Sequence, residues 1–240
     1  MYKGYLGIFL EETGTGSGFA FFSLIVLAFL AITILPYLLG SCNFSIIISK
    51  MFYHEDIRTF GSGNAGMTNM LRTYGLGAAA ATLATDAAKA VISALLGRLV
   101  FGIIGAYIAG LACVLGHIYP VFYKFKGGKG VVTAAITILM TNWKVGLVLI
   151  AMFVILVGFT KYISLGSVMC CLIYPLVLDR MNRIEQFPAP QIVMIFALAI
   201  TVVIVFKHTS NIKRLINGTE NKLSFTKKDR KPAEEKVDKK

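Results

Sequence analysis

Long apolar runs alternate with short polar segments along nearly the whole chain of 240 residues. About 20 apolar residues suffice to cross the hydrocarbon core of a bilayer, so each run is a candidate transmembrane helix. The pattern predicts an all-α membrane protein with about seven transmembrane helices. They cover residues 19–48, 76–104, 107–125, two short stretches of 131–160 on either side of Asn142-Trp143-Lys144, a stretch that ends at residue 178, and 191–206. Five crossings remain the alternative, because the fourth and fifth runs are short.

Composition supports a membrane protein over a soluble domain. The chain is 56% hydrophobic and only 15% charged, and its mean hydropathy is +0.73. A soluble domain of this size could not bury so much apolar surface. We therefore predict a membrane domain over residues 19–222, preceded by a retained extension (1–18) and followed by a disordered tail rich in lysine and glutamate (223–240). The four cysteines lie in apolar runs without C-x-x-C spacing, so neither a zinc site nor a disulfide framework is expected.

Lysine and arginine are distributed unevenly between the two sets of polar segments. With the N-terminus outside, the cytoplasmic segments hold the tail and Lys50, Arg58, Arg72, Lys124, Lys126, Lys129 and Lys161. The outer segments hold Lys3, Arg98, Lys144, Arg180 and Arg183. Cytoplasmic loops carry an excess of Lys and Arg, which predicts an outside N-terminus and a cytoplasmic C-terminus. The net charge of +12 indicates anionic lipid or an anionic substrate as partner, and nucleic-acid binding is not expected.

A glycine- and lysine-rich loop, residues 116–130, joins two of the predicted helices and ends in Gly127-Gly128-Lys129-Gly130. Glycines without Cβ atoms let successive N–H groups converge, and nearby lysines add positive charge, so we expect an anion site. The loop is not a Walker A motif, because a glycine follows Lys129 where Ser or Thr would hold magnesium. The alternative is a basic loop that contacts anionic lipid headgroups.

Three further polar segments are predicted to open on the same face. Residues 61–72 offer donors that could bind a ligand or merely cap helices: Ser62, Asn64, Thr68, Asn69 and Arg72. A turn over residues 161–167 carries Ser164 and Ser167, and the segment after the last apolar run carries His208, Asn211 and Glu220. Together they predict a pocket for a small phosphorylated molecule, with too few carboxylates for two metal ions. Asp86 and Lys89, three apart in an apolar run, are predicted to form a structural ion pair.

Three of these stretches, in order, resemble the motifs of the bacterial acyl-phosphate:glycerol-3-phosphate acyltransferase family of integral membrane enzymes. They are Gly61-Ser62-Gly63-Asn64 with Thr68-Asn69 and Arg72, the loop from Gly116-His117 to Gly130, and His208 with Asn211-Ile212 through Gly218 and Glu220. The resemblance covers roughly residues 35–222. Departures are Met67 at a position that is commonly alanine and a long connection before the last span.

The resemblance implies transfer of a fatty acyl group from acyl phosphate to the 1-hydroxyl of sn-glycerol 3-phosphate, which yields lysophosphatidic acid and phosphate without a cofactor or metal. It also implies a bacterial inner-membrane location, with the active site facing the cytoplasm. We expect catalytic roles for Ser62, Arg72, Lys129, Ser164, His208 and Asn211. We expect phosphate binding by Asn64, Thr68, Asn69, Lys126, Gly127, Gly128, Gly130, Ser167 and Glu220. An organic-phosphate transporter and a membrane scaffold that binds anionic lipid are the alternatives.

Overall fold

The computed structural model describes residues 18–187 and 190–224, together with the isolated residues 4 and 8. Within this part of the chain the fold is all-α and contains no strand. The helices are α2 (Gly18–Ser41), α3 (Phe44–Tyr53), α4 (Met67–Tyr74), α5 (Leu76–Ile118), α6 (Val131–Thr141), α7 (Trp143–Thr160), α8 (Ile163–Ile184), α9 (Pro190–Lys207) and α10 (Thr209–Ile216). Most of the predicted extension and tail lies outside the described residues.

The long helix α5 is a hairpin of two helical arms. Phe101 and Gly102 leave the helical region, and the φ of 64° at Gly102 suits a residue without a Cβ atom. The arms then run antiparallel, because Lys89 Nζ in the first arm lies 3.1 Å from His117 Nδ1 in the second. The predicted boundary was therefore misplaced: the first arm ends at residue 100 rather than 104, and the second begins at residue 103 rather than 107.

The second arm is also shorter than predicted. The helix ends at Ile118, and a loop with a short 3-10 turn (Val121–Tyr123) replaces the expected continuation to residue 125. The cause is Pro120, which has no N–H to donate and disfavours helical backbone at Tyr119 before it. The helix thus ends seven residues before its predicted end, and the connection to α6 is long enough to fold back on the end of α5.

The prediction of one helix over residues 19–48 is wrong. The helix α2 ends at Ser41, and the Asn43 side chain then accepts a hydrogen bond from Ile46 N to begin α3. The two predicted helices between residues 131 and 160 are confirmed, since Asn142 caps α7 by accepting from Val145 N at 3.1 Å. The predicted turn over 161–167 is only two residues long, because α8 begins at Ile163 and continues to Ile184.

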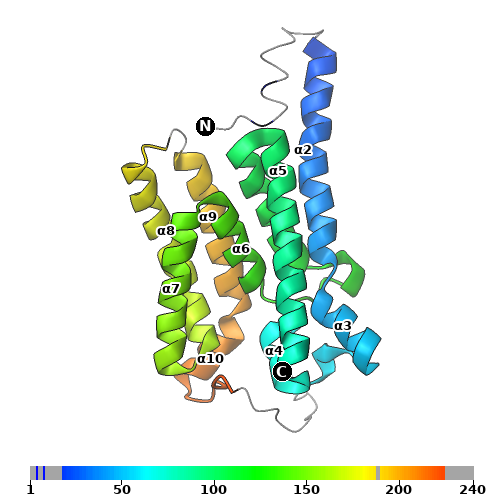
Figure 1. Ribbon diagram of the computed structural model, residues 1–240, viewed down its shortest axis with the longest axis vertical. Helices are drawn as coiled ribbons and strands as arrows, with labels where there is room; N and C mark the ends of the chain where they lie inside the picture. The colour runs from blue at the N-terminus through cyan, green and yellow to red at the C-terminus, as the bar shows by residue number, and fades with distance from the viewer. Residues whose placement is uncertain (1–3, 5–7, 9–17, 188–189, 225–240) are drawn as a thin grey trace, which may run out of the picture.

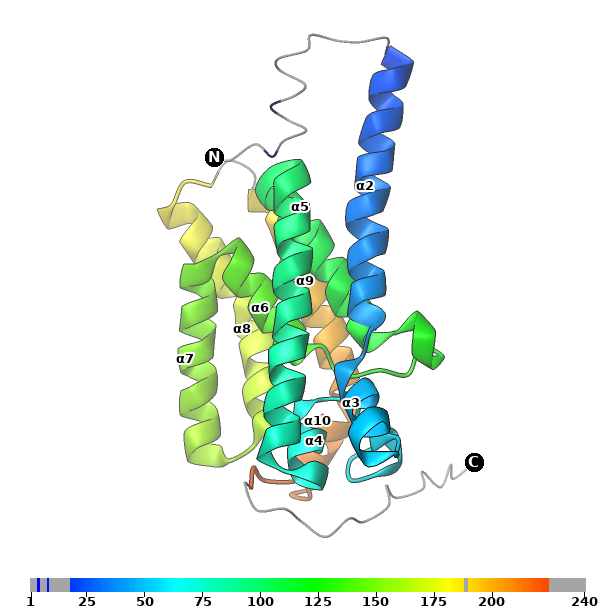
Figure 2. The same ribbon diagram turned by 45° about the vertical axis from the view of Figure 1, so that its right-hand side comes forward.

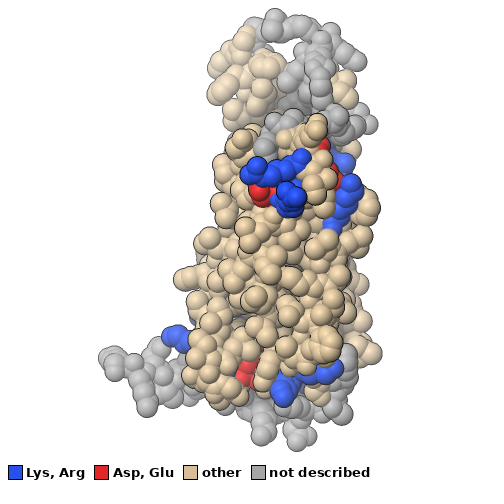
Figure 3. Space-filling view, turned by 90° about the vertical axis from the view of Figure 1, so that its left-hand side faces the viewer, with Lys and Arg blue, Asp and Glu red and all other residues tan. Residues whose placement is uncertain are grey.

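The helices form an elongated bundle with two distinct ends (Figure 1). The short helices α3, α4 and α10 gather at one end, opposite the start of α2 (Figure 2). On the face drawn in Figure 3 a broad band without charged residues separates charged groups near the two ends, as expected of a bilayer-spanning surface. By length and composition, four of the described helices could each span a membrane, and α9 with α10, bent by 58°, could be a fifth span.

Close backbone contacts join α2 to the second arm of α5. A Cβ atom on Gly40 of α2 would lie 2.2 Å from the carbonyl oxygen of Cys113, and one on Gly116 would lie 2.1 Å from that of Tyr37. Glycine at both positions lets the backbones of α2 and α5 approach directly. The other half of the bundle packs around a buried apolar cluster that includes Tyr107, Leu149 and Tyr174.

Candidate active site

One cavity of about 340 Å³ opens among α4, α5, α6, α7, α8 and α10. Its volume lies in the range of small-molecule sites. Most of the predicted site residues line it, although they come from four separate segments: Ser62, Asn64, Thr68, Asn69, Arg72, Lys129, Gly130, Ser164, Ser167, His208, Asn211 and Glu220. Polar groups gather at the end where α4 and α10 lie, and apolar side chains line the part between α6, α7 and α8.

Glu220 organises the polar end. Its Oε1 accepts hydrogen bonds from Asn211 Nδ2 at 2.8 Å and Ser164 Oγ at 3.0 Å, while its Oε2 accepts from Arg214 Nε at 2.7 Å. Burial alone would raise the pKa of this carboxyl, but the three hydrogen bonds and the arginine charge outweigh it and lower the pKa. The predicted role of Glu220 as a phosphate ligand needs correction, because an anionic carboxylate repels phosphate and here holds the donors that surround it.

Lys129 points into the same polar end. Its Nζ donates a hydrogen bond to Asn211 Oδ1, which leaves two N–H groups for a ligand. The pKa of Lys129 is lowered to about 8, chiefly because the ammonium group is withdrawn from water; Glu220 opposes this shift, and the charges of Arg214 and Arg72 contribute to it. A cluster of cations that depress one another's charge is a natural place for a phosphate, which would relieve their repulsion.

The α4 segment presents Arg72 and anchors the loop before it. Burial lowers the pKa of the Arg72 guanidinium, and within the described part of the chain no hydrogen bond holds it, so it can grip a ligand. Asn69 has a different task from the predicted one. Its Oδ1 accepts from Ser62 N at 3.0 Å, and its Nδ2 donates to the carbonyl oxygens of Ile57 and Phe60. Its side chain therefore shapes the loop over residues 57–62.

His208 lies at the bend between α9 and α10. Its Nδ1 is 2.8 Å from the carbonyl oxygen of Ile204, which cannot donate, so Nδ1 carries the proton and Nε2 keeps its lone pair. Burial lowers the pKa of His208 to about 4, with a further contribution from the charge of Lys129. The ring is therefore neutral at physiological pH, with one nitrogen able to accept a hydrogen bond.

The prediction for the glycine loop is partly wrong. Lys126, Gly127 and Gly128 are absent from the cavity wall, and Lys126 is exposed. The N–H of Gly127 donates to Ile118 O at 3.3 Å and that of Gly128 to His117 O at 3.1 Å, so neither amide is directed at an anion. A Cβ atom on Gly128 would lie 2.1 Å from His117 Nε2. These glycines let the loop pack against the end of α5, and of residues 127–130 only Lys129 and Gly130 reach the cavity.

The first turn of α6 supplies the amides that the glycines do not. Val131 and Val132 line the cavity, and the first N–H groups of a helix have no partner inside it. The helix N-terminus also carries partial positive charge, which attracts anions. Of the two serines on α8, Ser164 faces Glu220, whereas Ser167 donates to Ile163 O at 2.8 Å within its own helix.

Three further residues line the cavity although they were not predicted as site residues. Arg214, three residues after Asn211 on α10, completes the cation cluster. Asp86 and His117 also line the cavity, and the predicted ion pair is confirmed with Lys89 Nζ 2.8 Å from Asp86 Oδ1. The Lys89 ammonium also donates to the carbonyl oxygens of Gly40 and Cys42 at the end of α2. The pair thus joins α2, both arms of α5 and, through His117, the Lys129 loop.

A family model described as glycerol-3-phosphate acyltransferase matches residues 30–218. The chain belongs to the glycerol-3-phosphate acyltransferase family. The glycerol-3-phosphate acyltransferase of Finegoldia magna is 44% identical over 193 residues, which cover 79% of this chain and 93% of the relative. The glycerol-3-phosphate acyltransferase of Coxiella burnetii (strain RSA 493) is 41% identical over 202 residues, which cover 83% of this chain and 100% of the relative.

Solved structures of the family share this architecture. The crystal structure of PlsY (YgiH), an integral membrane glycerol 3-phosphate acyltransferase, in its glycerol 3-phosphate form is similar with a TM-score of 0.75 at 34% identity, over 82% of this chain and 96% of that chain. Its lysophosphatidic acid form gives 0.71 at 33% identity. Membership of the glycerol-3-phosphate acyltransferase family confirms the expectation drawn from the three motifs. The chain is accordingly a multi-pass integral membrane protein.

Proposed function

We propose that this protein transfers a fatty acyl group from acyl phosphate to the 1-hydroxyl of sn-glycerol 3-phosphate, giving lysophosphatidic acid and phosphate for phospholipid synthesis. The observation that carries the proposal is the single cavity that joins a cluster of cations and hydrogen-bond donors to an apolar groove. Both substrates have this character, since one is a small phosphate and the other a phosphate on a long apolar chain. The names and bound forms of the relatives support the same substrates.

The polar end supplies two kinds of phosphate contact. Arg72 and Arg214 offer planar guanidinium groups suited to paired hydrogen bonds, and Lys129 offers a point charge. The N–H groups of the first turn of α6 offer neutral donors. We assign the phosphate of glycerol 3-phosphate to the guanidinium groups and that of the donor to Lys129 and α6. Ser164 and Asn211, both fixed by Glu220, would orient the acceptor hydroxyl and the donor carbonyl.

Direct transfer is the mechanism that these groups favour. An acyl phosphate is already activated, so the protein needs to position the reactants and stabilise charge. The 1-hydroxyl oxygen forms a bond to the acyl carbon, the bond from that carbon to the phosphate oxygen breaks, and the hydroxyl proton passes to the departing phosphate. His208 Nε2 is the rival acceptor, but its pKa of about 4 makes it a weak base, so we assign it to hydrogen bonding.

We also propose seven crossings, with the N-terminus outside and the C-terminus in the cytoplasm of a bacterial inner membrane. The seven are α2, the two arms of α5, α6, α7, α8 and α9, in which the second arm and α6 are short and meet at the Lys129 loop. Support comes from the cations at the end that carries α3, α4 and α10, including Lys50, Arg58 and Arg72. Cysteine labelling from each side of sealed vesicles, with single cysteines near residues 58 and 183, tests this orientation.

One assay separates the candidate functions. Purified protein is incubated with a long-chain acyl phosphate and labelled glycerol 3-phosphate, and the products are separated by polarity. The proposed enzyme yields labelled lysophosphatidic acid and one equivalent of inorganic phosphate, whereas a transporter or a lipid-binding scaffold leaves both substrates intact. Acyl-CoA in place of acyl phosphate serves as the control for donor class. Equal turnover with acyl-CoA would overturn the donor assignment.

A further inference from the structure

The apolar part of the cavity follows one face of each of two helices. On α8 the lining positions are Ser164, Ser167, Cys170, Cys171 and Tyr174, which recur at intervals of three and four residues. On α7 they are Gly146, Leu149, Ile150 and Phe153, with the same intervals. This spacing keeps the side chains on one side of a helix over several turns. The cavity therefore extends lengthwise between α7 and α8, from the Ser164 end toward Tyr174.

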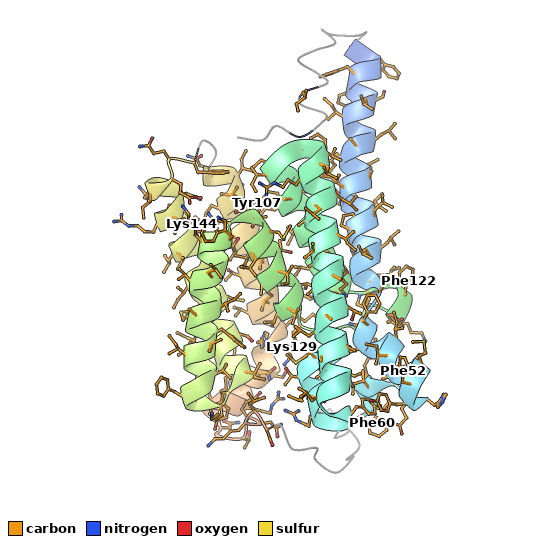
Figure 4. The ribbon with its side chains drawn as sticks, viewed as in Figure 1. Phe52, Phe60, Tyr107, Phe122, Lys129 and Lys144 are labelled. Carbon is orange, nitrogen blue, oxygen red and sulfur yellow. The ribbon has the colours of Figure 1, made fainter. Side chains whose placement is uncertain are left out.

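The far end of this groove is closed by a buried tyrosine. Tyr174 is 1% exposed and packs with Tyr107, Ile138, Val145 and Leu149. Tyr174 lines the cavity, and its hydroxyl is buried against Tyr107. Figure 4 shows Tyr107, which belongs to this closing cluster, near the upper end of the bundle and Lys129 well below it. The groove thus has a charged end, an apolar middle and a buried tyrosine at its limit.

We propose that Cys170 and Tyr174 determine which acyl-chain lengths this protein accepts. The inference rests on the proposed function, because it takes the groove to hold the acyl chain of the donor. Ten residues separate Ser164 from Tyr174, which corresponds to about 15 Å along a helix. An extended chain advances about 3.6 Å over three bonds, or about 1.2 Å a bond. About 12 bonds beyond the acyl carbonyl therefore reach Tyr174.

The packing around Tyr174 makes the limit selective. A chain that ends short of Tyr174 lies wholly inside the groove. A longer chain presses its methyl end against the Tyr174 side chain, which has little room to move inside the packed cluster. Chains beyond the limit must therefore bend or leave the groove sideways. Either course loses the favourable burial of the last methylenes.

Cys170 lies about halfway along the groove, six residues from Ser164, which corresponds to about 9 Å or seven bonds. Its Sγ donates to Leu149 O at 3.3 Å, and the residue is partly buried at the cavity wall. A larger side chain there would fill the groove beyond that point. Since Cys170 is small and borders open volume, Cys170→Phe needs less rearrangement than a substitution in the packed core.

The test measures kcat/KM at saturating glycerol 3-phosphate for saturated acyl phosphates of about 8 to 18 carbons, in steps of about two carbons. In Cys170→Phe we expect the ratio of the C16 to the C8 value to fall at least about tenfold. In Tyr174→Phe, which shortens the side chain at the closed end by its hydroxyl, we expect the ratio of C18 to C14 to rise about threefold. The two variants thus shift the preference in opposite directions.

Two matched controls share the helix. Cys170→Ser keeps the volume and the hydrogen-bond donor, and Leu176→Phe adds a ring at a position that is 70% exposed and outside the cavity. Both should retain the wild-type chain-length profile. Unchanged profiles in Cys170→Phe and Tyr174→Phe, with wild-type KM for glycerol 3-phosphate, would overturn the chain-length assignment and leave the proposed function intact. Absence of lysophosphatidic acid from the wild-type protein with every donor would overturn both. Tyr174→Phe alone decides the matter if Cys170→Phe does not fold.

Discussion

Raising the pH should remove the charge of Lys129 long before it affects an ordinary lysine. The pKa of Lys129 is lowered to about 8 because its ammonium group is withdrawn from water beside Arg214 and Arg72, and Glu220 only partly offsets this. If Lys129 binds substrate phosphate as a cation, the free enzyme loses affinity as pH rises through that value. The sign is fixed by the charge, since the neutral amine cannot attract an anion.

The size of the effect follows from the fraction of protonated lysine. With a pKa of about 8, about nine-tenths of Lys129 is charged at pH 7 and about one-tenth at pH 9. We therefore expect kcat/KM to fall about tenfold between those two values. At a saturating concentration of both substrates the fall in kcat should be smaller, because bound phosphate stabilises the ammonium group and raises its pKa.

Two variants assign this loss of activity to its source. In Lys129→Arg the guanidinium stays charged over the whole range, so the remaining activity should not fall above pH 8. In Glu220→Gln the charge that opposes the shift is removed, so the fall should begin at lower pH than in the wild type. The assay measures the initial rate of lysophosphatidic acid formation from about pH 6.5 to 10, in steps of about half a pH unit, at constant ionic strength. The rate of spontaneous donor hydrolysis is subtracted.

The outcome that would refute this reasoning is equally definite. The pKa of an unperturbed lysine is about 10. If the wild-type kcat/KM stays constant up to about that pH, Lys129 is not buried beside other cations. A fall near pH 8 that persists unchanged in Lys129→Arg would assign the titration to another group. In that case Lys129 would not be the cation that binds substrate phosphate.

Three further predictions concern other parts of the site. Lys89→Met leaves Asp86 buried without its cation and should destabilise the protein by about 3–5 kcal/mol in thermal unfolding in detergent. Adding Asp86→Asn should restore part of this stability. Equal melting temperatures of Lys89→Met and the wild type would contradict the prediction. Asn69→Ala removes three hydrogen bonds that shape the adjoining loop, so it should lower the free energy of unfolding by about 3 kcal/mol and raise the KM for glycerol 3-phosphate. If stability and KM both stay at their wild-type values, Asn69 does not shape the loop. His208→Ala should keep at least about one-tenth of kcat if phosphate takes the proton, whereas a loss beyond about a hundredfold would make His208 the base.

The residues of the polar end could be predicted because their chemistry is local. Arg72 and Lys129 stand in short polar segments between apolar runs, and Asn211 stands directly after the last run; a membrane confines such segments to its two faces. The alternation of runs then brings every second polar segment to the same face. Sequence alone thus identified most of the polar side chains that the cavity collects, without any knowledge of the contacts among them.

The boundaries and the detailed contacts were less predictable because they depend on distant partners. The turn at Phe101 and Gly102 lies inside a run that remains apolar on both sides, so hydropathy carries no signal for it. The position of the turn depends instead on Gly97 and Gly105, whose backbones meet only after the arms have folded together. The role of Glu220 was hidden for the same reason, since its three hydrogen-bonded partners come from two helices.

The glycine loop shows how a correct location can accompany an incorrect role. Glycine next to lysine suggests backbone amides converging on phosphate, yet the amides of Gly127 and Gly128 bind the carbonyl oxygens at the end of α5. What requires glycine is the approach of the loop to His117, whose ring and carbonyl leave no room for a Cβ atom. The His117 ring is in turn held by Lys89, which is paired with Asp86. The glycines therefore act on the substrate only through Lys129, by fixing where its ammonium group enters the cavity.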